Sequence, residues 1–451
     1  MTETEPKLKR ALGLRALVLY GLVLTQPTAP MPCYGVVSNT GKGHVVTAIL
    51  IGMLAMLLTA TSYGRMARVY PSAGSAYTYV GRELHPMAGY LVGWAMIFDY
   101  VMNPIICSIW CSKAVMQLAL LPQVPFAWWA VGFVLLFTFL NVRGIEASAR
   151  TNAVLAVGLG LVIALFLAAA VRYLGQAPAA ASTHLLRPFY DPQTFTFSSV
   201  ASGTSIAVLT YIGFDAVSTL SEEARDPRRD ILRATVLTCL LVGLLAAIEV
   251  YAAQLVWPAW HFTDPETAIP QIAGRIGGDL LMRTITLALL IATLGSGIGS
   301  HLAAGRLLYS MGRDGALPTR LFGSLDPRTR IQRNSILLVG AVALVGVLLL
   351  DYDTGAELLN FGAFVGFMGV NLSALFRYSI RRRSKRILDV VPPLFGFLIC
   401  LWLWLSLKPT AKLVGSVWLG LGLAFGAWQT RGFARPGKDP TPEPDAEDGS
   451  R

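Results

Sequence analysis

The sequence predicts an all-α, polytopic membrane protein with twelve transmembrane helices, and three observations support this fold class. The 451 residues are 54% hydrophobic and only 14% charged, and their mean hydropathy is +0.56, far from the balance of a soluble domain. Twelve apolar stretches each approach the roughly 20 residues that span a bilayer. Lys and Arg gather in alternate loops between these stretches.

The predicted spans follow one another along almost the whole chain. They begin near Leu12, Gly43, Met87, Phe126, Gly144, Ser198, Ile231, Thr284, Ser335, Gly355, Val391 and Leu413. Basic residues 7–15 precede the first stretch without a small-residue cleavage site, which predicts a retained signal anchor. The five cysteines form no Cys-x-x-Cys pair and fall in or beside apolar stretches, so we interpret them as packing residues and expect no metal site.

The net charge of +11 reflects membrane topology and not a nucleic-acid partner. If twelve spans place both termini on one side, 29 of the 37 Lys and Arg residues lie on that side. The positive-inside rule then predicts cytoplasmic N- and C-termini in a plasma (inner) membrane. The basic run at 377–386 (RYSIRRRSKR) becomes a cytoplasmic loop that can contact anionic lipid of the bilayer.

Two of the predicted spans are interrupted at comparable places. The first carries Thr25-Gln26-Pro27-Thr28-Ala29-Pro30-Met31-Pro32, through which a regular helix cannot run because proline has no amide hydrogen. The sixth carries Gly203-Thr204-Ser205 and Gly213-Phe214-Asp215. Because five spans separate the two, the chain halves have opposite orientation, which is typical of an inverted repeat with a mid-membrane site. The alternative is that the prolines only kink one helix and the glycines allow close packing.

These patterns divide the chain into three parts. Residues 1–11 form a cytoplasmic arm, and residues 12–430 form a transporter domain with repeats at about 12–174 and 198–378 and two further helices at about 391–430. Residues 431–451 are rich in Pro, Asp and Glu, which predicts a disordered cytoplasmic tail.

Several long motifs resemble those of the amino acid, polyamine and organocation (APC) permeases. They are SYGRMARVYPSAGSAYTYVGRELHPMAGYLVGWAMIFDY (62–100), GFDAVSTLSEEARDP (213–227) and RLLYSMGRDGALP (306–318). SHLAAGRLLYSMGRDG (300–315) and LLNFGAFVGFMGVNLSA (358–374) are most similar to the putrescine-importer branch. The resemblance implies a LeuT-like 5+5 inverted repeat with discontinuous helices 1 and 6 and alternating access around a central site.

Intramembrane acids and the two breaks supply the candidate binding residues. In amino-acid-transporting relatives the first break has free amides that hold a carboxylate, but here three prolines remove possible donors. Asp99, Asn103, Cys107 and Cys111 share one helical face, and Asp215 stands where polyamine carriers of the family have an acid. Two carboxylates could bind both ammonium groups of a diamine. The candidates are Thr25, Gln26, Thr28, Asp99, Asn103, Tyr211, Gly213, Phe214 and Asp215.

Each of the two acids also has a scaffold interpretation. Asp215 could act as a gate or helix-break cap, and Asp99 could hydrogen-bond locally.

The sequence contains two alternative sets of candidate residues for ion coupling. The lysine that replaces sodium in some proton-coupled relatives is absent, since no Lys or Arg lies between Asn152 and Val171. Thr293, Ser296 and Ser300 share a helical face and could bind a hard cation, or they could only pack among glycines. The unperturbed pKa of a histidine such as His301 suits proton transfer. Glu249 could be a further proton-linked site or an acid that faces a neighbouring helix. No cofactor is expected beyond H⁺ or Na⁺.

Together these features predict a secondary permease and not an enzyme, because GxxxxGK[ST] and HExxH motifs are absent from the sequence. The first choice is a monomeric or homodimeric importer of a small organic cation such as putrescine, coupled to protons. The alternatives are a neutral or cationic amino acid permease or exchanger, sodium-coupled or uncoupled, and then a channel or a transporter-like receptor.

Overall fold

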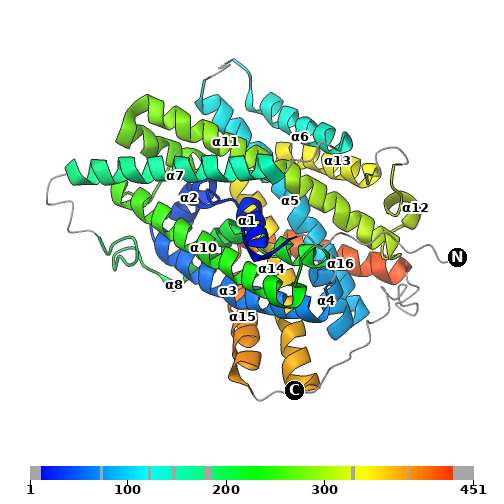
Figure 1. The fold of residues 1–451 in the computed structure, drawn as a ribbon. Coiled ribbons are helices and arrows are strands. Elements are labelled where there is room, and N and C mark those ends of the chain that lie inside the picture. The colour runs from blue at the N-terminus through cyan, green and yellow to red at the C-terminus, as the bar shows by residue number, and fades with distance from the viewer. Residues whose placement is uncertain are drawn as a thin grey trace.

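The computed structural model describes residues 12–71, 75–119, 123–144, 149–176, 185–326, 331–383 and 386–429. Within these ranges every regular element is helical, apart from one isolated bridge between Leu12 and Ala224. Figure 1 shows the helices packed into one bundle, with α1 in front of its centre. The predicted arm at 1–11 and the predicted tail at 431–451 lie outside the described residues.

Seven helices make up the first part of the chain. They are α1 (Leu14–Thr25), α2 (Pro30–Thr40), α3 (Val45–Val69), α4 (Ser75–Glu83), α5 (Pro86–Gln117), α6 (Phe126–Val142) and α7 (Ala149–Gln176).

The rest of the described chain begins with short elements and continues with long helices. They are α8 (Phe197–Ala207), the 3₁₀ turn η2 (Val208–Tyr211), α9 (Ala216–Thr219), η3 (Leu220–Glu222), α10 (Pro227–Val256), η4 (Pro265–Thr267), α11 (Ala268–Arg313), α12 (Thr319–Phe322), α13 (Arg333–Leu349), α14 (Tyr352–Leu375), the π-helical turn η5 (Phe376–Arg381), α15 (Ile387–Leu405) and α16 (Pro409–Gln429).

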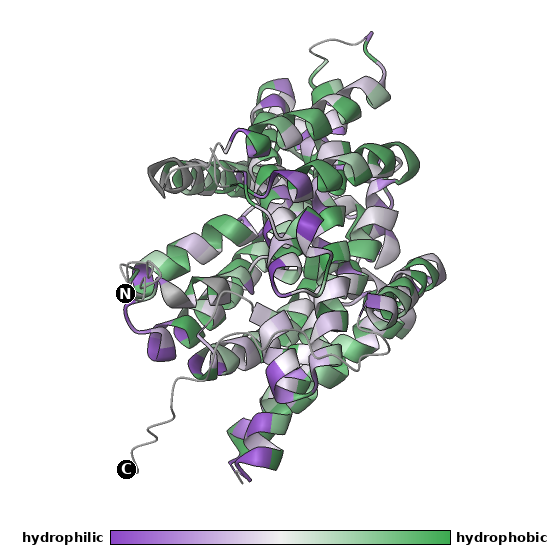
Figure 2. Ribbon diagram, turned by 90° about the vertical axis from the view of Figure 1, so that its right-hand side faces the viewer, coloured by the Kyte–Doolittle hydropathy of each residue, from purple (hydrophilic) through white to green (hydrophobic). Residues whose placement is uncertain are grey.

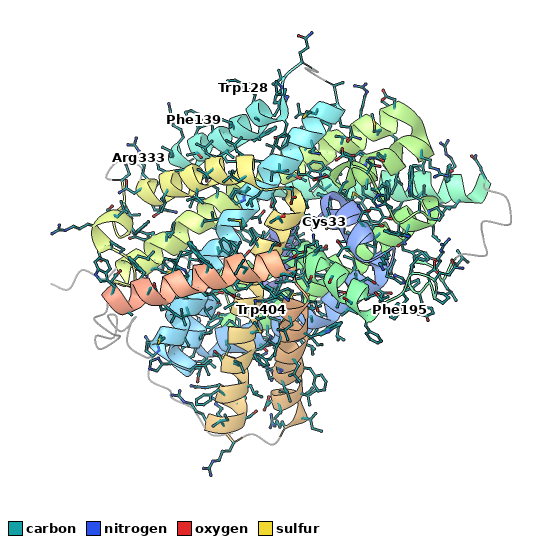
Figure 3. All side chains as sticks on the ribbon, turned by 180° about the vertical axis from the view of Figure 1, so that it is seen from behind. Cys33, Trp128, Phe139, Phe195, Arg333 and Trp404 are labelled. Atoms are coloured by element: carbon teal, nitrogen blue, oxygen red, sulfur yellow. The ribbon has the colours of Figure 1, made fainter. Side chains whose placement is uncertain are left out.

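The helices have the lengths and surfaces of a membrane protein. Among the described residues, nine helical segments are long and apolar enough to cross a bilayer, and α1, α6 and α13 are shorter apolar helices. Trp128 and Phe139 point outward from α6 and are 72% and 53% exposed, whereas Cys33 lies inside the bundle (Figure 3). Figure 2 shows hydrophobic residues along most of the helices, with many hydrophilic residues at their ends. The all-α, polytopic class is confirmed, while the number twelve stays a prediction.

The first predicted break is present and is shorter than the sequence suggested. α1 ends at Thr25, Gln26 adopts a positive φ of 58°, and α2 begins at Pro30. Pro30 and Pro32 therefore start a helix instead of ending one, because the first turn of a helix needs no amide hydrogen from these positions.

The second break lies later in the chain than one of its two predicted motifs. α8 runs without interruption through Gly203-Thr204-Ser205, so the break expected there was wrong. Gly203 serves packing instead, since a Cβ atom on it would lie 2.9 Å from Cα of Gly41. The chain leaves the α-helix after Ala207 and resumes it at Ala216, which places the interruption around Gly213-Phe214-Asp215 as predicted.

One predicted helix start was wrong and another is only partly described. α11 begins at Ala268 and not near Thr284, and it bends at Gly278, whose φ of 70° favours glycine. Asp279 and Arg283 lower the hydropathy of the stretch before Thr284, so hydropathy alone does not assign it to an apolar span. In the helix their side chains pair at 2.6 Å. The fifth span begins at Ala149 among the described residues, and 145–148 lie outside them.

Long helices hold the two interrupted segments in place. α10 packs along α3, both α11 and α14 pack along α5, and α2 packs against α8. At one end, the amide of Leu12 donates to the carbonyl of Glu223 (3.0 Å) and that of Arg225 donates to the carbonyl of Leu12 (2.8 Å). At the other end, Ser38 and Asn39 bond the connection that precedes α11. Both interrupted segments are thus anchored away from their breaks.

Candidate functional site

The two helix breaks touch each other inside the bundle. Gly213 has a φ of 110°, and a Cβ atom on it would lie 3.0 Å from the carbonyl oxygen of Leu24. Both the backbone angle and the narrow gap therefore require glycine. The Gln26 side-chain amide donates a hydrogen bond of 2.6 Å to the carbonyl of Ala292, which ties the first break to α11.

Two buried carboxylates stand beside the second break. Asp215 accepts a hydrogen bond of 3.4 Å from the hydroxyl of Tyr100 on α5. Asp99, the preceding residue of α5, is also buried, and its Oδ1 has no hydrogen-bond partner among the described residues. The two carboxyl groups lie within electrostatic range of each other. In the described part of the chain, no Lys or Arg forms an ion pair with either acid.

An aromatic cluster adjoins the same break. The ring centroids of Tyr63 on α3, Phe214 at the break and Phe367 on α14 lie 5.4 to 6.2 Å apart. Rings of this kind attract organic cations over their faces. Of the three, the sequence identified only Phe214, although Tyr63 lies within a motif that carried the family resemblance.

Tyr100 is the other functional candidate that sequence reasoning missed. Its position directly after Asp99 gave no signal, since neighbouring helical residues point about 100° apart and do not face the same side. This divergence directs its hydroxyl to Asp215, while Asp99 remains beside it on α5.

Several backbone amides at the two breaks donate hydrogen bonds to carbonyls of the same turn. The amide of Ala29 donates to Gln26 (2.9 Å) and that of Met31 donates to Thr28 (3.0 Å), while the prolines between them have no amide hydrogen. In the second break, the amides of Phe214 and Ala216 also donate to carbonyls within the turn. Few amides are left to bind a carboxylate.

The remaining predicted binding residues contact the scaffold. The Thr25 hydroxyl donates to Gly21 (2.8 Å), and the Tyr211 hydroxyl donates to the carbonyl of Ile49 (2.7 Å). Asn103 accepts from the thiol of Cys107 (3.2 Å), and Thr28 is buried. These hydrogen bonds, like that of Gln26 with Ala292, are with other protein groups and not with the two acids.

The predicted coupling residues lie in different places. His301 forms a 3.0 Å hydrogen bond through Nε2 to the carbonyl of Ile336 on α13. Because a carbonyl only accepts, Nε2 carries the proton, and the buried Nδ1 has no partner among the described residues. The Ser300 hydroxyl donates to Ser296 (2.8 Å) along its own helix. Thr293 is buried and directly follows Ala292, the acceptor of the Gln26 bond.

Glu249 is buried in α10, and neither of its carboxyl oxygens has a hydrogen-bond partner within the described ranges. The same ranges contain no group of three or more His, Cys, Asp or Glu residues that could hold a metal ion.

A multi-pass helical protein in which two interrupted helices meet at buried carboxylates has the architecture of a solute carrier. Comparison with protein families agrees, because the amino acid permease family matches residues 32–433. The chain belongs to this family, as its motifs predicted, and is a membrane transporter and not an enzyme.

Individual relatives cover nearly the full length of the chain. The low-affinity putrescine importer PlaP of Escherichia coli K12 is 35% identical over 95% of this chain and 96% of its own. The branched-chain amino acid permease BcaP of Lactococcus lactis is 26% identical over 90% of both chains. The methylthioribose transporter of Bacillus subtilis is 26% identical over 92% of both chains. These relatives differ in the solutes that they are named for.

Proposed function

We propose that this permease imports a small diamine such as putrescine across the plasma (inner) membrane by alternating access. The observation that carries the proposal is the pair of buried acids, Asp99 and Asp215, with which no Lys or Arg pairs in the described chain. A charge inside a membrane protein is costly unless it is paired. The two ammonium groups of a diamine supply the two missing partners.

The surroundings of the acids support a cation over a carboxylate-bearing solute. Phe214 directly precedes Asp215, and its ring packs with those of Tyr63 and Phe367, so aromatic groups of the kind that attract cations adjoin the acid. The first break has few free amides, which are the groups that would hold a substrate carboxylate at a helix N-terminus. The similarity to a putrescine importer over almost the whole chain points the same way.

The proposed architecture has twelve spans in a LeuT-like 5+5 inverted repeat with discontinuous helices 1 and 6. The nine long apolar segments and three shorter apolar helices of the described chain support this number. The breaks at Gln26 and Gly213 support the repeat, because each interrupts a helix at a corresponding place in its half. The distribution of Lys and Arg supports cytoplasmic termini.

Import is proposed to be coupled to protons. His301 and Glu249 are buried, titratable groups inside the helical bundle, each with at least one side-chain atom lacking a partner in the described residues. The rival device is a sodium site at Thr293, Ser296 and Ser300. The Ser300 hydroxyl already bonds its own helix, as small polar residues in packed helices commonly do.

A neutral or cationic amino acid is the second candidate solute, and the similarity to a branched-chain amino acid permease favours it. The two solute classes place different groups at the first break. An amino acid needs donors for its carboxylate, whereas a diamine does not.

Uptake by purified protein in proteoliposomes tests the proposal. Labelled putrescine is competed with a monoamine, a neutral amino acid and a basic amino acid, under proton or sodium gradients. Saturable, trans-stimulated uptake that diamines inhibit best supports the diamine carrier. Inhibition by amino acids without inhibition by diamines would assign the second candidate. Ohmic conductance would indicate a channel, and binding without accumulation would indicate a receptor.

A further inference from the structure

A pocket of about 580 Å³ lies at one end of the bundle, where the last turns of α3, the turn η5 and the start of α15 meet. Four arginines line this arginine pocket: Arg65, Arg68, Arg382 and Arg386. Among the described residues one carboxylate lines it, that of Asp389, which pairs with Arg65 at 3.2 Å. Positive charge therefore exceeds negative charge within the pocket.

Tyr378 contacts two of the arginines, Arg65 and Arg382. The Arg65 guanidinium lies 5.6 Å from the ring centroid of Tyr378, and that of Arg382 lies 5.9 Å from the same centroid. The Tyr378 hydroxyl donates to the backbone carbonyl of Arg65 (3.4 Å). These contacts join α3 to η5 and limit how far the two cations can separate.

Two of the four arginines have no ion pair within the described residues. In the described part of the chain, no carboxylate forms an ion pair with Arg68 or Arg382. Arg65 and Arg68 lie three residues apart on α3, so both face the same side of that helix. Like charges held this closely repel one another unless an anion binds between them.

Among the described residues one apolar side chain lines the pocket, that of Leu388, and the apolar residue before it is exposed too. Ile387 and Leu388, which begin α15, are 74% and 70% exposed, and Ile380 of η5 is also exposed. Such side chains at the end of membrane helices belong in the acyl region of a bilayer. The Lys and Arg distribution predicts that this end faces the cytoplasm, where the leaflet carries anionic lipids.

We propose that the arginine pocket binds the phosphodiester headgroup of an anionic phospholipid. The planar guanidinium of arginine places its N–H donors in a geometry that matches two phosphate oxygens. Several guanidinium groups around one phosphate bind it more tightly than a single cation does. The acyl chains of the same lipid would lie along Ile387 and Leu388. These exposed apolar side chains favour a lipid over free phosphate, which has no apolar part to contact them.

The test uses the full-length protein in a neutral detergent. Binding of phosphatidylglycerol is measured by native mass spectrometry and by the rise in unfolding temperature, beside phosphatidylcholine and inorganic phosphate at equal concentration. The test variant is Arg68→Gln/Arg382→Gln. The matched control is Arg228→Gln/Arg320→Gln, which removes two exposed arginines outside the pocket.

Phosphatidylglycerol should bind and stabilise the wild-type protein, and the test variant should bind it about thirtyfold more weakly, since each basic residue contributes about 1 kcal/mol and about 1.4 kcal/mol is tenfold. The control should bind as the wild type does. If the double variant fails to fold, Arg68→Gln alone should still weaken binding about fivefold.

Equal binding of phosphatidylglycerol by the test and control variants would overturn the proposal. Stabilisation by inorganic phosphate to the same degree as by phosphatidylglycerol would overturn the assignment to a lipid, as would equal binding of phosphatidylcholine.

Discussion

Replacing Asp215 by asparagine removes one of the two buried carboxyl groups and keeps the shape of the side chain. The Tyr100 hydroxyl, 3.4 Å away, can still donate to the asparagine carbonyl oxygen, so we expect the variant to fold and reach the membrane. A hydrogen bond to a charged group contributes about 1.5 to 3 kcal/mol. At about 1.4 kcal/mol per factor of ten, apparent affinity for putrescine should fall about ten- to 150-fold.

A second substrate separates a direct contact from a general loss of function. Butylamine has the same chain with one ammonium group, which Asp99 can still bind in the variant. Asp215→Asn should therefore weaken competition by butylamine much less than competition by putrescine. The control variant is Asp279→Asn, which changes an exposed acid of α11. The assay is competition against labelled putrescine in proteoliposomes, and equal losses for the two amines would assign Asp215 to the scaffold or gate.

Three further predictions concern the break, the coupling residue and the topology. Gly213→Ala adds a Cβ atom 3.0 Å from the Leu24 carbonyl at a φ of 110°, so thermal unfolding should show a loss of about 1 to 3 kcal/mol in stability. The control Gly158→Ala places its Cβ atom in open space and should not destabilise the protein. Equal stability of the two variants would contradict the close contact at Gly213. His301→Gln keeps a donor for the Ile336 carbonyl but cannot titrate, so uptake should lose its response to an imposed pH gradient while solute exchange persists. A normal uptake rate in His301→Gln, together with loss of uptake when choline replaces sodium, would favour sodium coupling instead. Reporter tags at Ser384 and at the C-terminus, both outside the described residues, should be cytoplasmic and a tag near Thr263 external, and labelling of Ser384 from outside would refute the topology.

Apolar length and proline chemistry made much of the fold predictable. The membrane class followed from hydropathy, and the first break followed from the missing amide hydrogens of its prolines. The start of α11 did not follow, because Asp279 and Arg283 satisfy each other along the helix while lowering the apparent hydropathy. Gly203 was misjudged because a glycine that opens a helix and a glycine that lets another backbone approach are identical in sequence.

The candidate site was predictable only where single residues are costly in a membrane. Asp99 and Asp215 stood out because a buried acid is expensive. Tyr63, Tyr100 and Phe367 did not, since aromatic residues are common in apolar helices and their role depends on which helices meet. The hydrogen bonds of Thr25 and Tyr211, with Gly21 and Ile49, are also contacts that sequence alone does not reveal.

The backbone bridge of Leu12 adds to the cost of opening one end of the carrier. Opening there would exchange two hydrogen bonds, one with Glu223 and one with Arg225, for bonds to water. Each exchange costs about 0.5 to 1.5 kcal/mol, or about 1 to 3 kcal/mol together. A cost of this size, taken by itself, would leave the open form at about 0.6 to 15% of the molecules. In the proposed alternating access, this end would then open by thermal motion alone. A bound solute would only have to increase the fraction of molecules in the open form.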